Sequence, residues 1–212
     1  MVFVMRTSFF KQLVALFFGA WVMAMPVWAD PGDTPDGLVK FVVEDVMNTI
    51  RNDKALQSGD LRKIHSLVDQ KILPYSNFQK TTQLAMGRNW PKATATQQSQ
   101  ITQEFKTLLI RIYSGALSQV KDQKIQYKPN RFAADDTDVI VRTVVIGKGE
   151  PVQLDYRVEK TPAGWKVYDI NVLGAWLVES YRTQFNDQIS KGGVDGLIAF
   201  LHERNTTLAN AK

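Results

Sequence analysis

The spacing of apolar residues changes twice along the chain, and these changes constrain the fold more than any other feature. From residue 35 to residue 118, apolar residues recur every three or four positions, which is typical of amphipathic helices. After Lys121 they recur every second position as far as Val172, which is typical of strands. From residue 174 the helical spacing returns. The chain is therefore predicted to place helices before and after a block of strands, an α+β organisation.

Two helices are predicted at the start of this pattern. Thr34 and Pro35 provide a helix N-cap followed by proline at the first helical position. A second helix is predicted to begin at Gly59-Asp60 and to end at Leu73, because Pro74 disfavours helical geometry in the residue before it.

Four more helices complete the prediction. A weaker helix covers residues 76–86, and a long helix follows the capping box formed by Thr94 and Gln97. Two further helices are expected near residues 174–190 and 194–206, separated by a pair of glycines. The total is about six helices.

The strand block divides into four predicted strands: residues 125–127, 139–146, 152–159 and 165–172. In the third strand apolar and polar residues alternate strictly, which predicts one buried face and one face in water. The connections are short and rich in turn-forming residues, so neighbouring strands should be antiparallel. We expect a meander sheet of about four strands packed with the helices.

Residues 1–29 have the order of a secretory signal peptide. Arg6 and Lys11 are the only charges before Asp30, an apolar run follows from Leu13 to Met25, and a small residue, Ala29, lies at the expected cut. The run is short for a transmembrane helix, which needs about 20 residues, so an uncleaved anchor is the less favoured interpretation. We expect cleavage after Ala29, which leaves residues 30–212 as a single domain. Export of a chain without cysteine favours a bacterial periplasm.

The sequence contains no recognisable catalytic or cofactor motif. The absence of cysteine excludes disulfides and thiolate chemistry, and the two histidines, His65 and His202, are too far apart to form a zinc-binding helix. The 26 basic residues only slightly outnumber the 21 acidic ones and lack interleaved aromatic residues, so nucleic-acid binding is not expected. We therefore predict no enzyme activity, no metal and no cofactor.

The chain also has more apolar segments than one side of a sheet needs. These are residues 108–110, 144–146, 170–173, 176–178 and 197–201. Two interpretations remain open: a thick core, or an internal apolar cavity between the sheet and the helices.

Five segments, taken in order, resemble the MlaC family of periplasmic phospholipid carriers, also called toluene-tolerance auxiliary components of an ABC transport system. The first, Val68–Tyr75, reads VDQKILPY and is similar to the family's V-D-x-x-[IL]-L-P-Y segment. The resemblance covers almost the whole chain after the predicted signal. The other four segments are Gly87–Thr94 with Gln97 and Phe105, Pro151–Tyr156, Trp165–Asp169, and Tyr181–Ile198.

The resemblance implies a soluble periplasmic carrier that holds the acyl chains of a phospholipid in an apolar cavity and moves lipid between the outer and inner membranes. It also implies handover to an inner-membrane ABC transporter complex and an outer-membrane lipoprotein–porin complex, and we expect a monomer. The candidate lipid-binding residues are apolar or aromatic and lie on the long helix, the sheet and the last helices. They are Phe105, Leu108, Leu109, Ile112, Val141, Leu154, Tyr156, Val158, Tyr168, Leu177, Tyr181, Phe185, Leu197 and Leu201.

One segment departs from the family pattern. Where the family usually has E-G-[VI]-S, this chain has Leu173-Gly174-Ala175-Trp176, and a buried Trp176 would narrow a pocket. This departure leaves open a carrier of another apolar molecule, such as a terpenoid or sterol-like lipid. A third alternative is an NTF2-like pocket enzyme that uses Asp169 with Tyr168, but neighbouring strand residues point to opposite faces.

Overall fold

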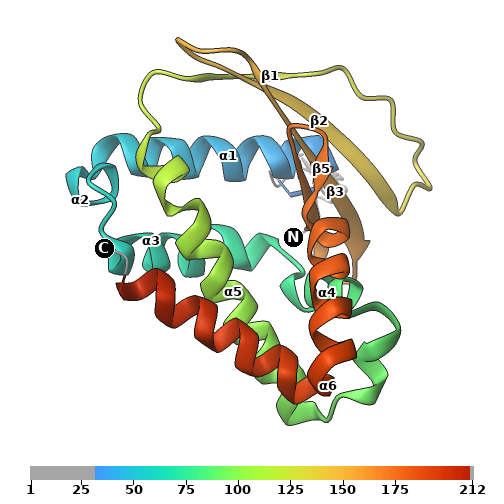
Figure 1. The fold of residues 1–212 in the computed structure, drawn as a ribbon. Helices are drawn as coiled ribbons and strands as arrows, with labels where there is room; N and C mark the ends of the chain where they lie inside the picture. Colours follow the sequence, from blue (N-terminus) through green and yellow to red (C-terminus); the bar gives the residue numbers. More distant parts are fainter. Residues whose placement is uncertain (1–31, 211–212) are drawn as a thin grey trace, which may run out of the picture.

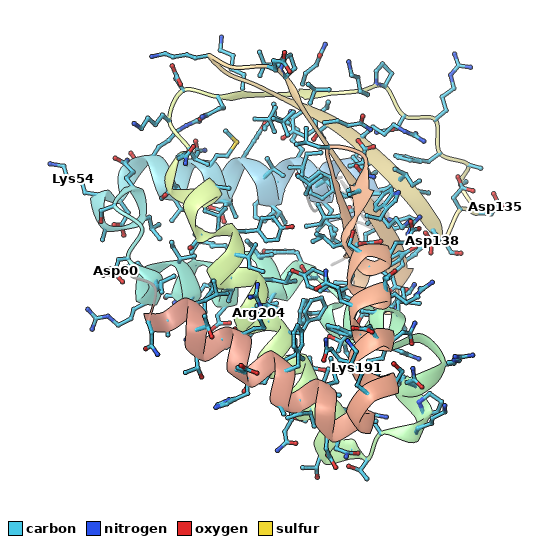
Figure 2. All side chains as sticks on the ribbon, in the orientation of Figure 1. Lys54, Asp60, Asp135, Asp138, Lys191 and Arg204 are labelled. Carbon is cyan, nitrogen blue, oxygen red and sulfur yellow. The ribbon has the colours of Figure 1, made fainter. Side chains whose placement is uncertain are left out.

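The computed structural model describes residues 32–210, and the predicted signal peptide and its cleavage site lie outside this range. The described residues form an α+β fold with six α-helices and a five-stranded antiparallel sheet, which confirms the predicted fold class (Figure 1). Charged side chains such as Lys54 and Asp135 point outward from this fold (Figure 2). No helix within residues 32–210 is both long and apolar enough to cross a membrane.

The N-terminal helices begin at side-chain caps. Thr34 accepts a hydrogen bond from the Gly37 amide, as predicted, and the carboxylates of Asp53 and Asp60 cap the next two helices. The predicted end at Leu73 is wrong, because Pro74 occupies the first turn of a 3₁₀ helix that continues the chain to Tyr75. The elements are α1 (Pro35–Asn52), α2 (Lys54–Gln57), α3 (Leu61–Leu67), a π-helical turn (Val68–Ile72) and a 3₁₀ turn (Leu73–Tyr75).

The next two helices follow the sequence prediction closely. α4 (Phe78–Met86) ends at Gly87, whose φ of 53° suits glycine. A 3₁₀ segment (Gly87–Lys92) leads to α5 (Ala95–Ser118), which starts with the predicted capping box of Thr94 and Gln97.

The sheet is a meander with the strand order β1-β2-β3-β4-β5, and all neighbouring strands are antiparallel. The fifth strand was not predicted, because its two residues were assigned to the start of a helix. The turn at Leu173 and Gly174 folds residues 175–176 back onto β4, so the helix begins only at Leu177. The strands are β1 (Lys124–Tyr127), β2 (Asp138–Ile146), β3 (Val152–Thr161), β4 (Gly164–Val172) and β5 (Ala175–Trp176).

The last element, α6 (Leu177–Asn210), consists of two helical parts joined at a kink. Gly192 and Gly193 have non-helical backbone angles. The φ of 66° at Gly193 is one that residues other than glycine rarely adopt. The two predicted C-terminal helices are therefore confirmed. Figure 1 shows the first part running on from β5 and the second part lying along α5.

Most buried apolar residues of residues 32–210 fall into three separate clusters. The helix cluster joins α4, α5 and α6 and includes Phe105 and Phe185. The sheet cluster joins α1 to one face of the sheet and includes Leu38 and Val158, and we call this the α1 face. The N-terminal cluster joins α1, α3 and α5 through residues such as Ile110. Most domains have one contiguous core, so this division is informative.

The other face of the sheet, which we call the outer face, is less exposed than the alternation of β3 predicted. Asp155 is only 4% exposed, which contradicts a face fully in water. Its strand neighbour is Asn171, which in turn pairs with Trp176 on the unpredicted β5. The added strand therefore brings a large side chain onto this part of the outer face.

Candidate functional site

The two halves of α5 differ in how completely their apolar side chains are buried. In the N-terminal half, Ile101 and Phe105 are buried in the helix cluster. In the C-terminal half, Leu108 and Ile110 are still buried, but Leu109 and Tyr113 are only half-buried and Ile112 is 42% exposed. Residues 109, 112 and 113 lie on one side of the helix, since three or four positions make one turn. This half of α5 therefore presents an apolar surface that no described element covers fully.

The α1 face of the sheet shows the same decline in burial toward the β4–β5 turn. Val141 and Val158 are fully buried beside Leu38 and Val39 of α1. Further along the strands, the paired residues Leu154 and Val172 are only half-buried. This face therefore also ends in partly exposed apolar side chains.

Partly exposed apolar residues also lie where the clusters border one another. Val42 of α1 packs against both the sheet cluster and the N-terminal cluster, although these two share no buried residue. Ile72 and Leu73 lie at the edge of the N-terminal cluster, and Tyr75 lies at the edge of the sheet cluster. An acyl chain placed against such borders would remove apolar surface from water without displacing a packed core.

The helix cluster itself is a tightly packed aromatic group. The ring of Phe105 lies 4.7 Å from that of Tyr181 and 5.0 Å from that of Phe185, both edge-on, and 5.5 Å from that of Phe78. Burial raises the pKa of the Tyr181 hydroxyl to about 12. These contacts make the group a structural core rather than an open surface.

Asp169 joins the sheet to α6 from the outer face. Its carboxylate accepts hydrogen bonds from the amides of Ile170 and Val178, at 2.9 and 3.0 Å, and from Arg157 at 3.0 Å. Burial raises the pKa of this carboxyl, while the hydrogen bonds and Arg157 act in the opposite direction. Because Val178 lies in the first turn of α6 and the other two partners lie in the sheet, this carboxylate anchors the start of α6 to the sheet.

Trp176 lies on this outer face and not toward α1. It pairs with Asn171, which shares a face with Asp169 and Arg157, and its ring lies 4.0 Å from the guanidinium carbon of Arg157. A cation–π contact of this kind holds the ring in place. The expectation that Trp176 would narrow a pocket is therefore wrong for the α1 face, because successive residues of a strand point to opposite faces.

Tyr168 lies apart from the other candidate residues. Its hydroxyl donates to the carboxylate of Asp138, with oxygens at 2.8 and 2.9 Å, and the Lys80 ammonium lies 3.8 Å from its ring centre. Burial is the main cause that raises the pKa of this hydroxyl. The expectation that Tyr168 and Asp169 point to opposite faces is wrong, because a bulge at Arg157/Val158 places both on the outer face. The two side chains nevertheless have separate sets of partners.

The structure brings the candidate lipid-binding residues together in two groups rather than one. The exceptions are Tyr168, in its polar network, and Ile112, on the exposed half of α5. Sequence analysis missed Tyr113, although its position four residues after Leu109 was a signal for it. Phe105, Leu108, Leu109, Leu177, Tyr181, Phe185, Leu197 and Leu201 belong to or border the helix cluster, and Val141, Leu154, Tyr156 and Val158 belong to or border the sheet cluster.

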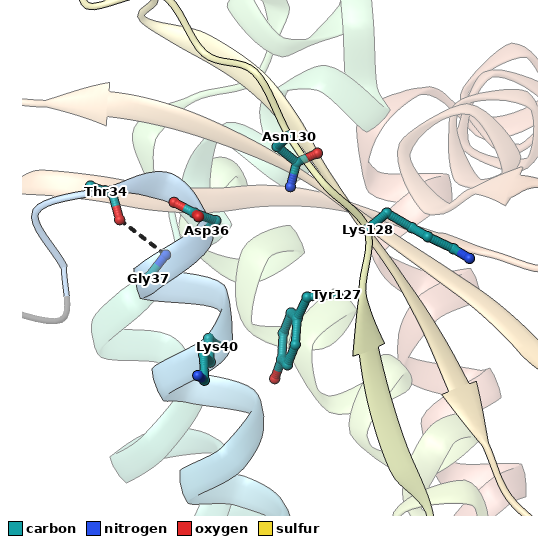
Figure 3. Close-up of a pocket in the computed structure, with 7 residues that line it drawn as sticks. All are labelled: Thr34, Asp36, Gly37, Lys40, Tyr127, Lys128 and Asn130. Atoms are coloured by element: carbon teal, nitrogen blue, oxygen red, sulfur yellow. Dashed lines mark hydrogen bonds between the residues drawn. The ribbon is translucent and has the colours of Figure 1, made fainter.

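A surface hollow of about 210 Å³ lies between the start of α1 and the end of β1 (Figure 3). Its lining includes the polar side chains of Asp36, Lys40 and Asn130, and the ring of Tyr127 lies between the two elements. The hollow is smaller than most ligand pockets, and none of the candidate residues lines it. Within residues 32–210, no three His, Asp or Glu side chains gather closely enough to hold a metal ion.

Comparisons with known proteins add independent information. The profile of the MlaC protein family matches residues 40–203. The chain is 22% identical to the intermembrane phospholipid transport system binding protein MlaC of Haemophilus influenzae over 174 residues, 80% of this chain and 81% of that protein. It is 23% identical to the toluene tolerance protein ttg2D of Pseudomonas putida over 174 residues, 81% of this chain and 80% of that protein.

A solved structure is considerably more similar. It is the phospholipid-binding protein from Ralstonia solanacearum in complex with a phospholipid, and it is 59% identical in sequence. The superposition has a TM-score of 0.81 and covers 82% of this chain and 98% of the other.

Proposed function

We propose, starting from the fact that the chain belongs to the MlaC family, that it binds phospholipid and transports it between two membranes. The observation that carries the proposal is the phospholipid bound by the Ralstonia protein, which is 59% identical to this chain over the aligned residues. The partly exposed apolar side chains of α5 and the α1 face offer acyl chains a surface in the present fold.

The energetics suit a carrier. Each buried CH₂ of an acyl chain contributes about 0.8 kcal/mol relative to water, so lipid strongly prefers the protein to free solution. Relative to a bilayer most of this gain cancels, because membrane and protein surface are both apolar. A carrier therefore needs apolar contacts and no nucleophile, and transfer can run in either direction.

The finer parts of the proposal concern location and partners. We propose that residues 1–29 direct export to the periplasm and are removed after Ala29. The mature chain, a single domain, would act as a monomer and exchange lipid with an inner-membrane ABC transporter complex and an outer-membrane lipoprotein–porin complex. Intact-mass measurement of the exported protein tests the cleavage, and a full-length membrane-bound species would refute it.

Organic extraction and mass spectrometry of protein purified without detergent test the cargo. We expect phospholipid in roughly stoichiometric amount. A lipid-free extract, together with failure to bind added phospholipid, would refute the proposed function. The alternative of a terpenoid or sterol-like cargo rested on Trp176 and loses its support, since that ring lies on the outer face.

A further inference from the structure

The turn between β4 and β5 contains a leucine in a conformation that leucine rarely adopts. Two residues connect the strands, Leu173 and Gly174, and their φ angles are 53° and 91°. Positive φ at both positions is the requirement of a type I′ hairpin turn, which favours Asn-Gly. In this region of backbone space the Cβ of leucine approaches the carbonyl oxygen, so the residue is strained.

The same leucine is also left in water. Its side chain is 70% exposed, compared with 42% for Ile112 and Ile146, the other exposed large apolar residues of the described chain. The backbone amide of Leu173 donates to the Gln153 carbonyl, and the Gly174 amide donates to the side chain of Asn171. An asparagine at position 173 would keep both bonds and lose the strain, so folding gives no reason for leucine here.

The turn stands at the end of the partly exposed α1 face. Val172, directly before Leu173, pairs with Leu154, and both are half-buried. Leu173 thus directly follows this apolar surface along the chain, and its side chain is exposed to solvent. Figure 1 shows β5 between this turn and α6, so the turn projects away from the helix that follows.

The surroundings of the turn suit a lipid layer. Residues 170–178 contain no charged side chain, and Arg157, which contacts the Trp176 ring, belongs to β3 and not to the turn, so the tip of the turn itself carries no ion into acyl chains. Gly174 and Ala175 are small and exposed, which leaves Leu173 as the projecting group. Trp176, the next large residue, is of the type enriched at membrane interfaces. A fluid lipid layer can conform to such a convex tip, whereas a protein partner would need a matching pocket.

We infer that Leu173 enters the apolar layer of a phospholipid bilayer when lipid is loaded or released, and that this contact speeds transfer. The inference rests on the proposed function. A lipid that leaves the protein must move its acyl chains past water, and an apolar side chain that bridges protein and bilayer reduces the surface exposed on the way.

The test is transfer of a fluorescent phospholipid from loaded protein to vesicles of phosphatidylcholine and phosphatidylglycerol. Leu173→Asn should retain its lipid content but transfer it about tenfold more slowly, because an apolar contact is lost from the transition state. Its Tm should rise by about 2–4 °C, because the strain is relieved. Leu173→Gly, which also accepts positive φ, should transfer as slowly as Leu173→Asn.

Two controls separate the contact from general effects. Leu173→Met keeps an apolar tip and should transfer nearly as fast as the unaltered protein. Ile146→Asn removes another exposed apolar side chain, on β2, and should leave the rate unchanged. If Leu173→Asn and Leu173→Gly transfer lipid at the normal rate, the inference is wrong even though the proposed function stands. An unaltered protein that takes up no phospholipid would contradict the proposed function and this inference together.

Discussion

The helix cluster and the partly exposed apolar surface differ in burial although their residue types are alike. The N-terminal half of α5 buries Phe105 completely, between the rings of Tyr181 and Phe185. The C-terminal half of the same helix leaves Ile112 42% exposed and Tyr113 half-buried. Stability and lipid binding are therefore expected to depend on different parts of one helix.

The largest expected loss of stability follows from a substitution in the helix cluster. Phe105→Ala should lower the free energy of unfolding by about 3–5 kcal/mol, because it leaves a cavity among packed rings. Urea titration of lipid-free protein measures this, since bound lipid would itself stabilise the fold. The matched variant Tyr113→Ala should lower the free energy of unfolding by only about 1–2 kcal/mol. It should instead lower the lipid content of the purified protein. Equal losses of stability in the two variants would contradict the distinction.

The next largest effect concerns the outer face. Arg157→Met should cost about 3 kcal/mol, because the buried Asp169 carboxylate loses its cation. Lys63→Met is the control, since Lys63 and Asp53 form a solvent-exposed pair, and it should cost less than about 1 kcal/mol. Lipid content should stay the same in both variants. Loss of lipid from Arg157→Met would mean that the outer face also contributes to binding.

Trp176→Ser should have a smaller effect, about 1 kcal/mol, because it removes one cation–π contact and a half-buried ring. The profile of bound lipids should not change, since the ring lies away from the α1 face. Mass spectrometry of the extracted lipid is the measurement. A shift toward bulkier lipids would restore the idea that Trp176 limits the size of the cargo.

Leu109→Trp should change stability least. Leu109 is half-buried, so the larger ring can extend along the partly exposed surface, and the cost should stay below about 1 kcal/mol. The ring would occupy space that an acyl chain uses, so lipid content should fall. If the position were closed core, overpacking would cost about 1–3 kcal/mol and lipid would be retained. Melting temperature and lipid content of the same sample distinguish the two outcomes.

Local sequence signals predicted most of the fold. The cap at Thr34, the capping box of Thr94 and Gln97 and the change in apolar spacing all act within a few residues, and the structure contains each. β5 could not be predicted in this way. It exists because Leu173 adopts a left-handed conformation that its residue type disfavours, so the turn signal was hidden.

The candidate site was harder to predict than the fold. Helical spacing places Phe105, Leu109 and Ile112 near one another, but it does not say which of them a neighbouring helix will cover. That depends on α6, which begins about 60 residues after α5 ends and contacts α5 from Gln97 to Arg111 but leaves Ile112 exposed. Tyr168 was predicted to line the pocket because of its aromatic ring. In the structure its hydroxyl donates a hydrogen bond to the Asp138 carboxylate, at the start of β2.

The most direct test of the central claim is a map of where the acyl chain lies. The protein would be loaded with a phospholipid that carries a photoactivatable group in one acyl chain, and the crosslinked peptides would be identified by mass spectrometry. We predict crosslinks to residues 109–116 of α5 and to residues 152–156 and 170–173 of the sheet. Crosslinks confined to the outer face or to residues 197–205 of the helix cluster would contradict the claim that lipid binds at the partly exposed apolar surface.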